Sequence, residues 1–341
     1  MKKTAVVILN WNGADLLRRF LPSVIQHSRN EAEIWVADNA STDDSVKITE
    51  AEFPEVKLLR LDKNYGFAGG YNRALKEIKA DYYVLLNSDV EVTSGWLTPI
   101  LRQFEIQPDL GASQPLIRAW HHKDSFEYAG AAGGYMDYLG YPFCRGRIFD
   151  TLEFDEGQYN TPVEIFWATG AAFFVRSDVY HACGGLDDEF FAHMEEIDLC
   201  WRMKNRGWKI ICEPQSIVYH VGGGTLNQGS PRKTFLNFRN NLNLLLKNLP
   251  GSKLIPVLFL RMVLDGVAAF SFLFQNKGHL HFLAVLKAHL HFYGGFASHF
   301  KKRKQVKPKP VSQIYQRSIL WDYHLKKRRK FSQLPKDYFS S

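Results

Sequence analysis

Cysteine is scarce in this chain, with four residues among 341. Cys144, Cys183, Cys200 and Cys212 are scattered through the sequence, and their spacing does not match that of zinc ligands. Such a pattern is more typical of buried thiols than of a disulfide framework. We therefore expect reduced, mostly buried cysteines.

The N-terminus has no long apolar run. Residues 5–9 are apolar, but this stretch is too short for the core of a secretory signal peptide. It fits a first buried strand better, so we expect the folded body of the protein to stay in the cytoplasm.

Acidic residues are almost absent from the C-terminal part of the chain. Residues 275–341 contain 15 Lys and Arg against 2 Asp and Glu, whereas the other 274 residues contain 28 against 33. The body is therefore mildly acidic and only the C-terminal segment is basic. A protein that binds nucleic acid more often spreads positive charge over its folded face, so we expect no nucleic-acid partner.

Two common nucleotide-binding fingerprints are also missing, namely GxGxxG and the P-loop with its Lys-Ser/Thr. The segment NYGFAGGYN, residues 64–72, instead places Gly66, Gly69 and Gly70 around a probable helix start. Free N–H groups at a helix start favour phosphate, although these glycines alone are weak evidence.

Strand-like and helix-like stretches alternate through the first hundred residues. We expect strands at residues 4–9, 33–37, 56–61 and 82–86, and helices at 14–27, 43–53, 68–78 and 96–104. Residues 82–86, YYVLL, are apolar throughout, as in a strand buried on both faces. This alternation predicts right-handed crossovers and an α/β fold with a mostly parallel central sheet.

Polar residues follow each of these strands, and ligands of open α/β sheets bind at the carboxyl ends of the strands. Asp89, which follows the fourth strand, could hold a divalent cation against a diphosphate, or could merely cap the next helix. Asp38, which follows the second strand, could accept from a base or ribose, or could form an Asx turn. The other candidates at strand ends are Asn10, Asn12, Asn64, Asn87 and Ser88.

The pattern changes after residue 110. Residues 118–160 have no clear periodicity and predict a long loop-like region, which usually serves as a binding or lid element. Strands are expected at 163–169 and 171–176, around Gly170, and at 208–212 and 216–220, ending at His220. Between them, Glu195, Glu196 and Asp198 open a helix, either for chemistry or simply because acids suit a helix N-terminus. Asp198 and Arg202 can pair on that helix.

Seven segments of the chain carry a family resemblance. In order, they are VVILNWNG, VADNASTD, NYGFAGGYN, LLNSDVEV, ATGAAFFVR, FFAHMEEIDLCWR and VYHVGGGT. Together they resemble a family 2 glycosyltransferase of the GT-A fold, and more narrowly the bacterial rhamnosyltransferase-like branch that builds cell-surface polysaccharides. The resemblance covers roughly residues 1–245. It implies an inverting transfer from a nucleotide-activated sugar, helped by Mg²⁺ or Mn²⁺.

The resemblance also implies roles for individual residues. Asp89 matches the metal-binding acid of the family's Asp-x-Asp element, whose first member is Asn87 here, and His220 becomes a further metal or diphosphate ligand, unless it is only a polar surface residue. The catalytic base is expected at Glu196, where the family usually has Asp, with Glu195 as the second candidate. Small residues such as Gly170 would let the donor sugar approach, although packing explains them as well. The nucleoside would be held by Asn10, Asp38 and the segment 64–72, including Asn64, Gly66, Gly69 and Asn72. Asn12 and Ser88 are expected to bind the nucleotide sugar as well.

Two apolar stretches, residues 254–274 and 280–300, predict a C-terminal helical appendage. Arg261 and Asp265 interrupt the first stretch and could pair with each other. We expect a helical hairpin in or on the membrane interface, with membrane spanning, soluble packing and dimerisation as alternatives. The basic clusters at 301–304 and 326–330 fit anionic headgroups, unless they form a solvated tail.

The expected organisation is therefore a nucleotide-sugar-binding half at 1–105, an acceptor-binding and catalytic half at 106–245, membrane-associated helices at 246–300 and a basic tail at 301–341. The expected function is transfer of a sugar, possibly from dTDP-rhamnose, to a lipid-linked or growing surface glycan at the inner face of the cell membrane. The alternative is a non-catalytic protein of the same fold that binds nucleotide sugars or glycans. A homodimer is possible.

Overall fold

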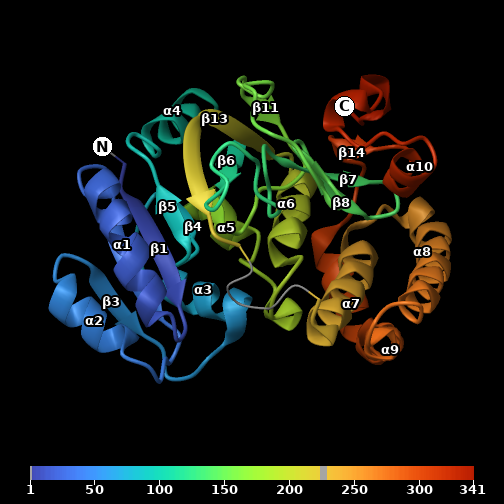
Figure 1. The fold of residues 1–341 in the computed structure, drawn as a ribbon, viewed down its shortest axis with the longest axis horizontal. Helices are drawn as coiled ribbons and strands as arrows, with labels where there is room; N and C mark the ends of the chain where they lie inside the picture. The colour runs from blue at the N-terminus through green and yellow to red at the C-terminus, as the bar shows by residue number, and fades with distance from the viewer. Residues whose placement is uncertain (1, 223–228) are drawn as a thin grey trace.

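The structure is a computed structural model that describes residues 2–222 and 229–341 (Figure 1). Its first half alternates strands with helices, as the sequence predicts. The elements are β1 (Thr4–Asn10), α1 (Ala14–Ser28), β2 (Glu33–Asp38), α2 (Ser45–Glu52), β3 (Lys57–Arg60), α3 (Gly66–Glu77), β4 (Tyr82–Leu86), β5 (Val90–Val92) and α4 (Thr98–Ile106).

The central sheet has the order β3, β2, β1, β4 on one side, and every neighbouring pair in this part is parallel. All five residues of β4 are buried, because helices cover both faces of the sheet (Figure 1). Parallel strands end at the same edge, so the polar residues after β1, β2 and β4 come together there.

The second half of the chain extends this sheet through β6 (Leu110–Ala119), β11 (Val163–Glu164), β12 (Ala172–Arg176) and β13 (Lys209–His220). Strand β12 runs antiparallel between β4 and β6, and β13 pairs parallel with β6 and antiparallel with β5. The sheet is thus parallel in its first half and mixed in its second, and the predicted α/β fold class is confirmed. Helices α5 (Ser177–Ala182) and α6 (Glu195–Asn205) and the short helix η1 (Asp188–Phe190) complete this part.

Three local predictions need correction. Of residues 163–169, only Val163–Glu164 form a strand. The two strands expected at 208–212 and 216–220 are one strand, β13, with an irregular register between Glu213 and Ile217. The region 118–160 is not a plain loop, because it contributes β7 (Gly134–Asp137), β8 (Pro142–Cys144), β9 (Arg147–Ile148) and β10 (Thr151–Leu152) to a second sheet.

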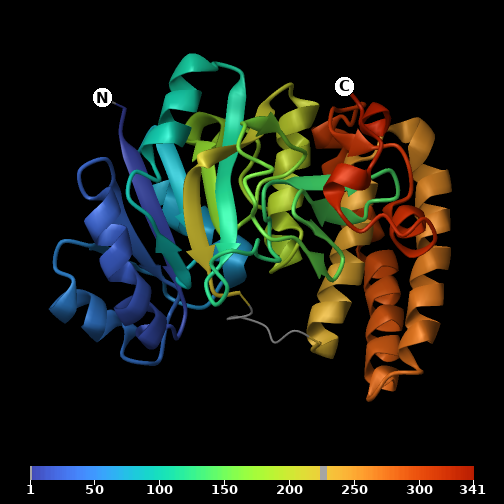
Figure 2. The same ribbon diagram turned by 45° about the horizontal axis from the view of Figure 1, so that its top comes forward.

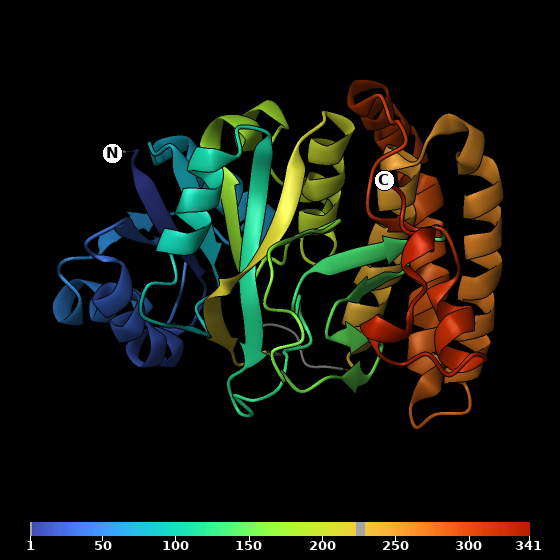
Figure 3. The same ribbon diagram turned by 90° about the horizontal axis from the view of Figure 1, so that it is seen from above.

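This second sheet lies between the central sheet and the C-terminal helices (Figure 3). Its strands are two to four residues long. One edge strand is β14 (Ile314–Tyr315), which pairs with β7. Gly134 sits against the indole of Trp167, where a Cβ atom would come within 2.1 Å of the ring. Only glycine fits that position.

The C-terminal part contains α7 (Pro231–Asn248), α8 (Gly251–Phe272) and α9 (Gly278–Val306), followed by α10 (Ile319–His324), η2 (Phe331–Gln333) and η3 (Lys336–Tyr338). The predicted hairpin is therefore helical, as α8 and α9. The segment expected as a basic tail is folded rather than free: Tyr315 and Ile319 are fully buried, and the segment packs across the second sheet (Figure 2). All four cysteines are buried and unpaired, as expected.

Candidate active site

One cavity of about 440 Å³ brings most of the predicted catalytic residues together. It lies between the ends of the central-sheet strands, the start of α6, the second sheet and helices α7 and α8. Six predicted site residues line it: Asn87, Asp89, Gly170, Glu195, Glu196 and His220. The acid after β4 and the acids that open α6 therefore face a single space.

At one wall, Asp89 and His220 are in direct contact. His220 Nε2 lies 3.2 Å from Asp89 Oδ1, and Nδ1 of the same ring lies 3.1 Å from Oε2 of Glu127. The contact arises because β5 pairs with β13, which places His220 opposite Val90. Val221 N also donates to Asp89 O at 3.1 Å, and this bond fixes the turn that carries the acid.

The charges of this group are coupled. Burial alone would lower the pKa of His220, but hydrogen bonding and charge from Asp89 and Glu127 outweigh it and raise the pKa to about 10. Burial would likewise raise the pKa of Asp89, but the contact with His220 holds it below its usual range. At neutral pH the group is an ionised carboxylate beside an imidazolium.

The start of α6 forms another wall. Glu195 is 5% exposed, and Oε2 of both Glu195 and Glu196 has no hydrogen-bond partner among the described residues. Burial, with the charge of Glu196 next to it, raises the pKa of Glu195 well above its usual range. Burial also raises the pKa of Glu196, to about 7, while backbone N–H groups at the helix start oppose the shift. Perturbed carboxyls of this kind are typical of catalytic sites.

The loop before α6 has a strained backbone. Phe191, His193 and Met194 all have positive φ, at 65°, 69° and 73°. Asn240 on α7 holds this loop, because its Nδ2 donates to the carbonyl oxygens of Phe190, Ala192 and His193 at 3.0, 2.9 and 2.8 Å. The sequence gives no sign of this role, nor of the role of Glu127, because both depend on contacts between distant segments.

The predicted nucleoside-binding residues form a second cluster at the ends of β1 and β2. Asn10 Nδ2 donates to Asp38 Oδ1 at 3.2 Å, and Ser41 N donates to Asp38 Oδ2 at 3.0 Å. The bond from Ser41 N fits the turn-forming role that was the alternative prediction for Asp38. Asn10 Oδ1 is buried and has no partner in the described chain. Ser88 faces the same cluster, since its Oγ lies 3.8 Å from where a Cβ of Gly13 would stand.

Asn12 and Asn64 both shape loops at this edge. Asn12 Oδ1 accepts from Thr42 N at 2.7 Å. Asn64 Oδ1 accepts from Gly66 N at 2.8 Å and from Asn39 Nδ2 at 3.1 Å. Because Phe67 N also donates to Phe191 O at 3.1 Å, two of the first N–H groups of α3 already have partners.

Gly66 and Gly69 allow close packing at the start of α3. A Cβ at Gly66 would come within 2.8 Å of the Phe191 ring, and one at Gly69 within 3.1 Å of the Tyr65 side chain. Asn72 lies apart from the nucleoside cluster. Its side chain bonds to both backbone groups of Leu186, to Tyr180 Oη and to Asp188. The structure therefore shows Asn72 bracing a loop, rather than facing the predicted donor site.

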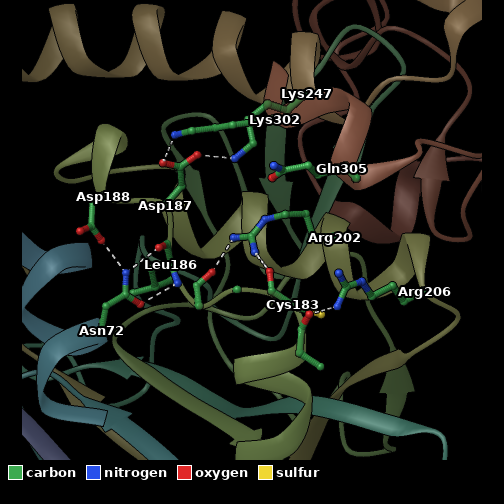
Figure 4. Close-up of a pocket in the computed structure, with 14 residues that line it drawn as sticks. Asn72, Cys183, Leu186, Asp187, Asp188, Arg202, Arg206, Lys247, Lys302 and Gln305 are labelled. Atoms are coloured by element: carbon green, nitrogen blue, oxygen red, sulfur yellow. Dashed lines mark hydrogen bonds and ion pairs between the residues drawn. The ribbon is translucent and has the colours of Figure 1, made fainter. Parts of the chain in front are cut away.

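Asn72 borders a second cavity of about 430 Å³, shown in Figure 4. Lys247 and Lys302, which line it, both contact Asp187 at 2.6 Å, and Lys247 also contacts Asp198, which lies behind the cavity wall, at 2.9 Å. Asp198 also pairs with Arg202 at 2.8 Å, as predicted from their spacing. These pairs join α6, α7 and α9, so this cavity is built around structural ion pairs.

Asp89 and His220 are the side chains in the first cavity that suit a metal ion. In the described part of the chain, no group of three or more His, Cys, Asp or Glu residues is arranged to hold one. Mg²⁺ and Mn²⁺ are commonly held by one or two protein groups plus substrate phosphates, so these two residues fit such an ion. Gly223 and Gly224, part of the glycine run after His220, lie outside the described residues.

Comparison with known proteins agrees with this arrangement. A family model described as glycosyl transferase family 2 matches residues 5–177, more than half of the chain. The N-acetylglucosaminyl-diphospho-decaprenol L-rhamnosyltransferase of Mycobacterium tuberculosis is 27% identical over 233 residues, covering 63% of this chain and 75% of that protein. The O-antigen biosynthesis protein RfbC of Myxococcus xanthus is 24% identical over 229 residues, covering 64% of this chain but only 17% of that protein.

Solved structures show the same fold. A crystal structure of GalNAc-T7 with UDP, GalNAc and Mn²⁺ superposes with a TM-score of 0.61 at 16% identity, covering 96% of this chain and 57% of that one. S. aureus TarS 1–349 in complex with UDP-GlcNAc superposes with a TM-score of 0.55 at 13% identity, covering 91% of this chain and 93% of that one. The chain therefore belongs to glycosyl transferase family 2, and it is a rhamnosyltransferase-like glycosyltransferase with the GT-A fold.

Proposed function

We propose that this enzyme transfers a sugar, with inversion, from a nucleotide-diphosphate donor to a hydroxyl of a lipid-linked or growing surface glycan. The observation that carries the proposal is the single cavity lined by Asp89, His220, Glu195 and Glu196. Such a transfer needs a base for the acceptor hydroxyl and positive charge for the departing diphosphate. The start of α6 offers carboxyl groups that can act as the base, and the wall with Asp89 and His220 offers groups that can hold positive charge beside the diphosphate.

Glu196 is the proposed base. It is more exposed to the cavity than Glu195, and its pKa of about 7 leaves a substantial ionised fraction near neutral pH. Glu195 is buried, and its pKa is raised further by the neighbouring charge, so it is expected to stay protonated. A protonated Glu195 limits the negative charge that Glu196 must face.

Asp89 and His220 are the proposed holders of Mg²⁺ or Mn²⁺, with the donor diphosphate supplying further oxygen ligands. His220 would have to release a proton to bind the ion, because only a neutral imidazole has a free lone pair. Such an ion neutralises the charge that develops on the leaving diphosphate. The structures of GalNAc-T7 and of the mannosyltransferase PcManGT from Pyrobaculum calidifontis contain Mn²⁺, which supports the assignment by analogy. The imidazole favours Mn²⁺ over Mg²⁺, because magnesium prefers oxygen ligands.

The nucleoside of the donor is proposed to bind at the ends of β1 and β2. The free Oδ1 of Asn10 and the remaining lone pairs of Asp38 can accept from the N–H groups of a base or the hydroxyls of a ribose. dTDP-rhamnose is the first donor to test, because the Mycobacterium relative is named as an L-rhamnosyltransferase.

The α8–α9 hairpin is proposed to lie on the inner face of the cell membrane, where a lipid-linked acceptor would be. Helix α8 is the one described helix that is long and apolar enough to cross a membrane, by length and composition only. Two of its three charged residues pair inward, with Arg261 Nε 2.7 Å from Asp265 Oδ1, so Lys253 near its start is the one exposed charge on this helix. Large apolar side chains exposed on the hairpin include Ile255, Phe259, Val263, Val267, Phe270, Phe274, Leu283, Leu286, Leu290 and Tyr293.

Exposed basic residues accompany this apolar face, including Lys253, Lys301 and Lys304. Anionic headgroups attract such residues by about 1 kcal/mol each. Sedimentation with phosphatidylglycerol vesicles tests the assignment: Phe259→Glu with Phe270→Glu should abolish binding, whereas Phe154→Glu, at an equally exposed phenylalanine elsewhere, should not. Wild-type protein that ignores the vesicles but dimerises through this face would contradict it.

The catalytic test is a panel of nucleotide sugars with Mg²⁺ or Mn²⁺, scored by release of nucleoside diphosphate with and without candidate acceptors. Glu196→Gln should fold normally and lose at least about 100-fold in rate, the scale of a positioned base. Glu195→Gln is the matched control and should lose much less. Donor binding without turnover in the wild type would instead favour a non-catalytic binding protein, and near-normal turnover in Glu196→Gln would remove Glu196 from the role.

A further inference from the structure

Two arginines that line the active cavity have no role in the transfer proposed above. Arg147 comes from β9 of the second sheet and Arg261 from α8, and both line the cavity. They are 6% and 5% exposed, so both guanidinium groups are largely removed from water. Cations in such positions are costly unless an anion compensates them.

Arg147 has only weak partners. Within the described chain, its hydrogen bonds go to Phe149 O at 3.4 Å and to Cys144 Sγ at 3.5 Å, and its Nε has no partner. The ring of Tyr128 lies 4.1 Å from its guanidinium carbon. None of these groups carries a formal negative charge, so Arg147 is a buried cation without a counter-ion in contact.

Arg261 is held rigidly but is incompletely bonded. Its Nε donates to Asp265, whose other oxygen lies 3.3 Å from His289 Nε2, and its guanidinium stacks on Tyr141 at 3.9 Å. Its Nη1 is buried and has no partner among the described residues. The acid and the aromatic ring thus fix the direction of a guanidinium that still has a free donor.

We propose that Arg147 and Arg261 form a phosphate subsite for the acceptor, which is a lipid-linked phosphate or diphosphate. Two arginines present planar, forked donors that match phosphate oxygens. Arg261 lies on the inner face of α8, while the outer face of the same helix carries Phe259 and Val263. An acceptor could therefore place its phosphate against Arg261 and its apolar chain about one helix diameter away, roughly 10 Å.

That the ligand is the acceptor rests on the proposed function, whereas the anion site itself does not. The alternative source of phosphate is the donor diphosphate. That group is assigned to Asp89 and His220 together with a metal ion, so withholding or adding metal allows binding of the two phosphates to be measured separately.

The test uses the full chain and two probes. Farnesyl diphosphate, with farnesol as its phosphate-free match, is titrated in EDTA so that no metal site can form; dTDP and UDP are titrated with Mn²⁺. Wild-type protein should bind farnesyl diphosphate at least tenfold more tightly than farnesol. Arg147→Gln and Arg261→Gln should each weaken that binding by about tenfold or more, the scale of a lost charge-assisted hydrogen bond, and leave nucleotide binding unchanged.

Two controls keep the result interpretable. Lys79→Gln removes an exposed cation that has no role in either proposed site and should leave the binding of both probes unchanged. Arg147→Gln does not touch the Arg261–Asp265 pair, so it tests the subsite even if Arg261→Gln destabilises α8. Thermal unfolding reports on the fold of each variant.

The proposal fails if farnesol and farnesyl diphosphate bind equally, if Arg147→Gln and Lys79→Gln behave alike, or if the arginine variants lose nucleotide binding as much as farnesyl diphosphate binding. These outcomes are separate from the enzymatic proposal. Arginine-dependent binding without turnover of any nucleotide sugar would keep the subsite and refute the proposed function. Turnover of a nucleotide sugar, together with farnesyl diphosphate binding that does not depend on the arginines, would support the proposed function and refute the subsite.

Discussion

Replacing Asn240 with leucine tests how much the active site depends on α7. Asn240 is fully buried, and its amide donates to three carbonyl oxygens of the loop that leads into α6. The amide has two N–H groups, so the substitution removes about two hydrogen bonds and leaves carbonyls without a donor, for a loss of about 2–4 kcal/mol. Leucine has nearly the same shape, so packing should change little.

The loop should also relax, because its positive-φ residues persist only while surrounding contacts hold them. Relaxation would move Glu196, which lies three residues after His193, the last of the three bonded carbonyls. Misplacing a catalytic group by about 1 Å costs up to about 100-fold, so we expect kcat to fall by about 10- to 100-fold. Urea unfolding and initial rates of nucleoside diphosphate release measure the two effects.

Asn243→Leu is the matched control. Asn243 lies on the same helix and is 2% exposed, and its Oδ1 has no partner in the described chain. Removing an unsatisfied amide should be neutral or stabilising. The reasoning is refuted if the two variants lose the same unfolding free energy, or if Asn240→Leu keeps wild-type kcat.

Four further predictions concern charge. The wild-type rate should rise with pH through about 7 as Glu196 loses its proton, and Glu196→Gln should lose that dependence. Because burial raises the pKa of Glu196 in the folded state, its ionisation destabilises the fold increasingly above pH 4.5, so Glu196→Gln should raise Tm at pH 8.5 and not at pH 4. Glu127→Gln removes one of two carboxylates beside His220 and should lower the pKa of His220 from about 10 in an NMR titration of its ring protons. Lys247→Met removes the cation that Asp187 and Asp198 share but leaves them Lys302 and Arg202, so it should lower the unfolding free energy in urea by about 1.5–3 kcal/mol, the scale of a lost hydrogen bond to a charged group.

The parallel half of the fold was predictable because its signals are local. Each strand is a short apolar run, each helix has its own periodicity, and strand–helix alternation admits few topologies. The apolar run that became β4 is an example, since its five residues are all buried in the structure. The end of such a strand is also where Asp89 was expected and found.

The second sheet could not be predicted in this way. Strands of two to four residues are too short to show alternation, and β14 lies more than 170 residues after its partner β7. Tyr315 is fully buried although it belongs to a strongly basic segment. The basic composition of residues 301–341 suggested a free tail. In the structure this segment is folded, because β14 pairs with the distant strand β7.

The site shows the same division. Asp89, Glu196 and His220 stand at the ends of predictable elements, so position and family resemblance found them. Glu127 and Asn240 act only through partners that are far away in sequence, at His220 and at the loop before α6. No local pattern distinguishes such residues from ordinary buried polar side chains.

The C-terminal helices cannot be separated from the catalytic part. The boundary expected at residue 245 cuts α7, which continues to Asn248, and it leaves Arg261 of the cavity wall on the other side. Lys302 of α9 contacts Asp187, which precedes the loop before α6, at 2.6 Å. The α8–α9 surface that we propose to lie on a membrane is thus joined by ion pairs to the segment that leads to Glu196, the proposed base. We therefore expect a chain shortened to residue 245 to lose both vesicle binding and turnover.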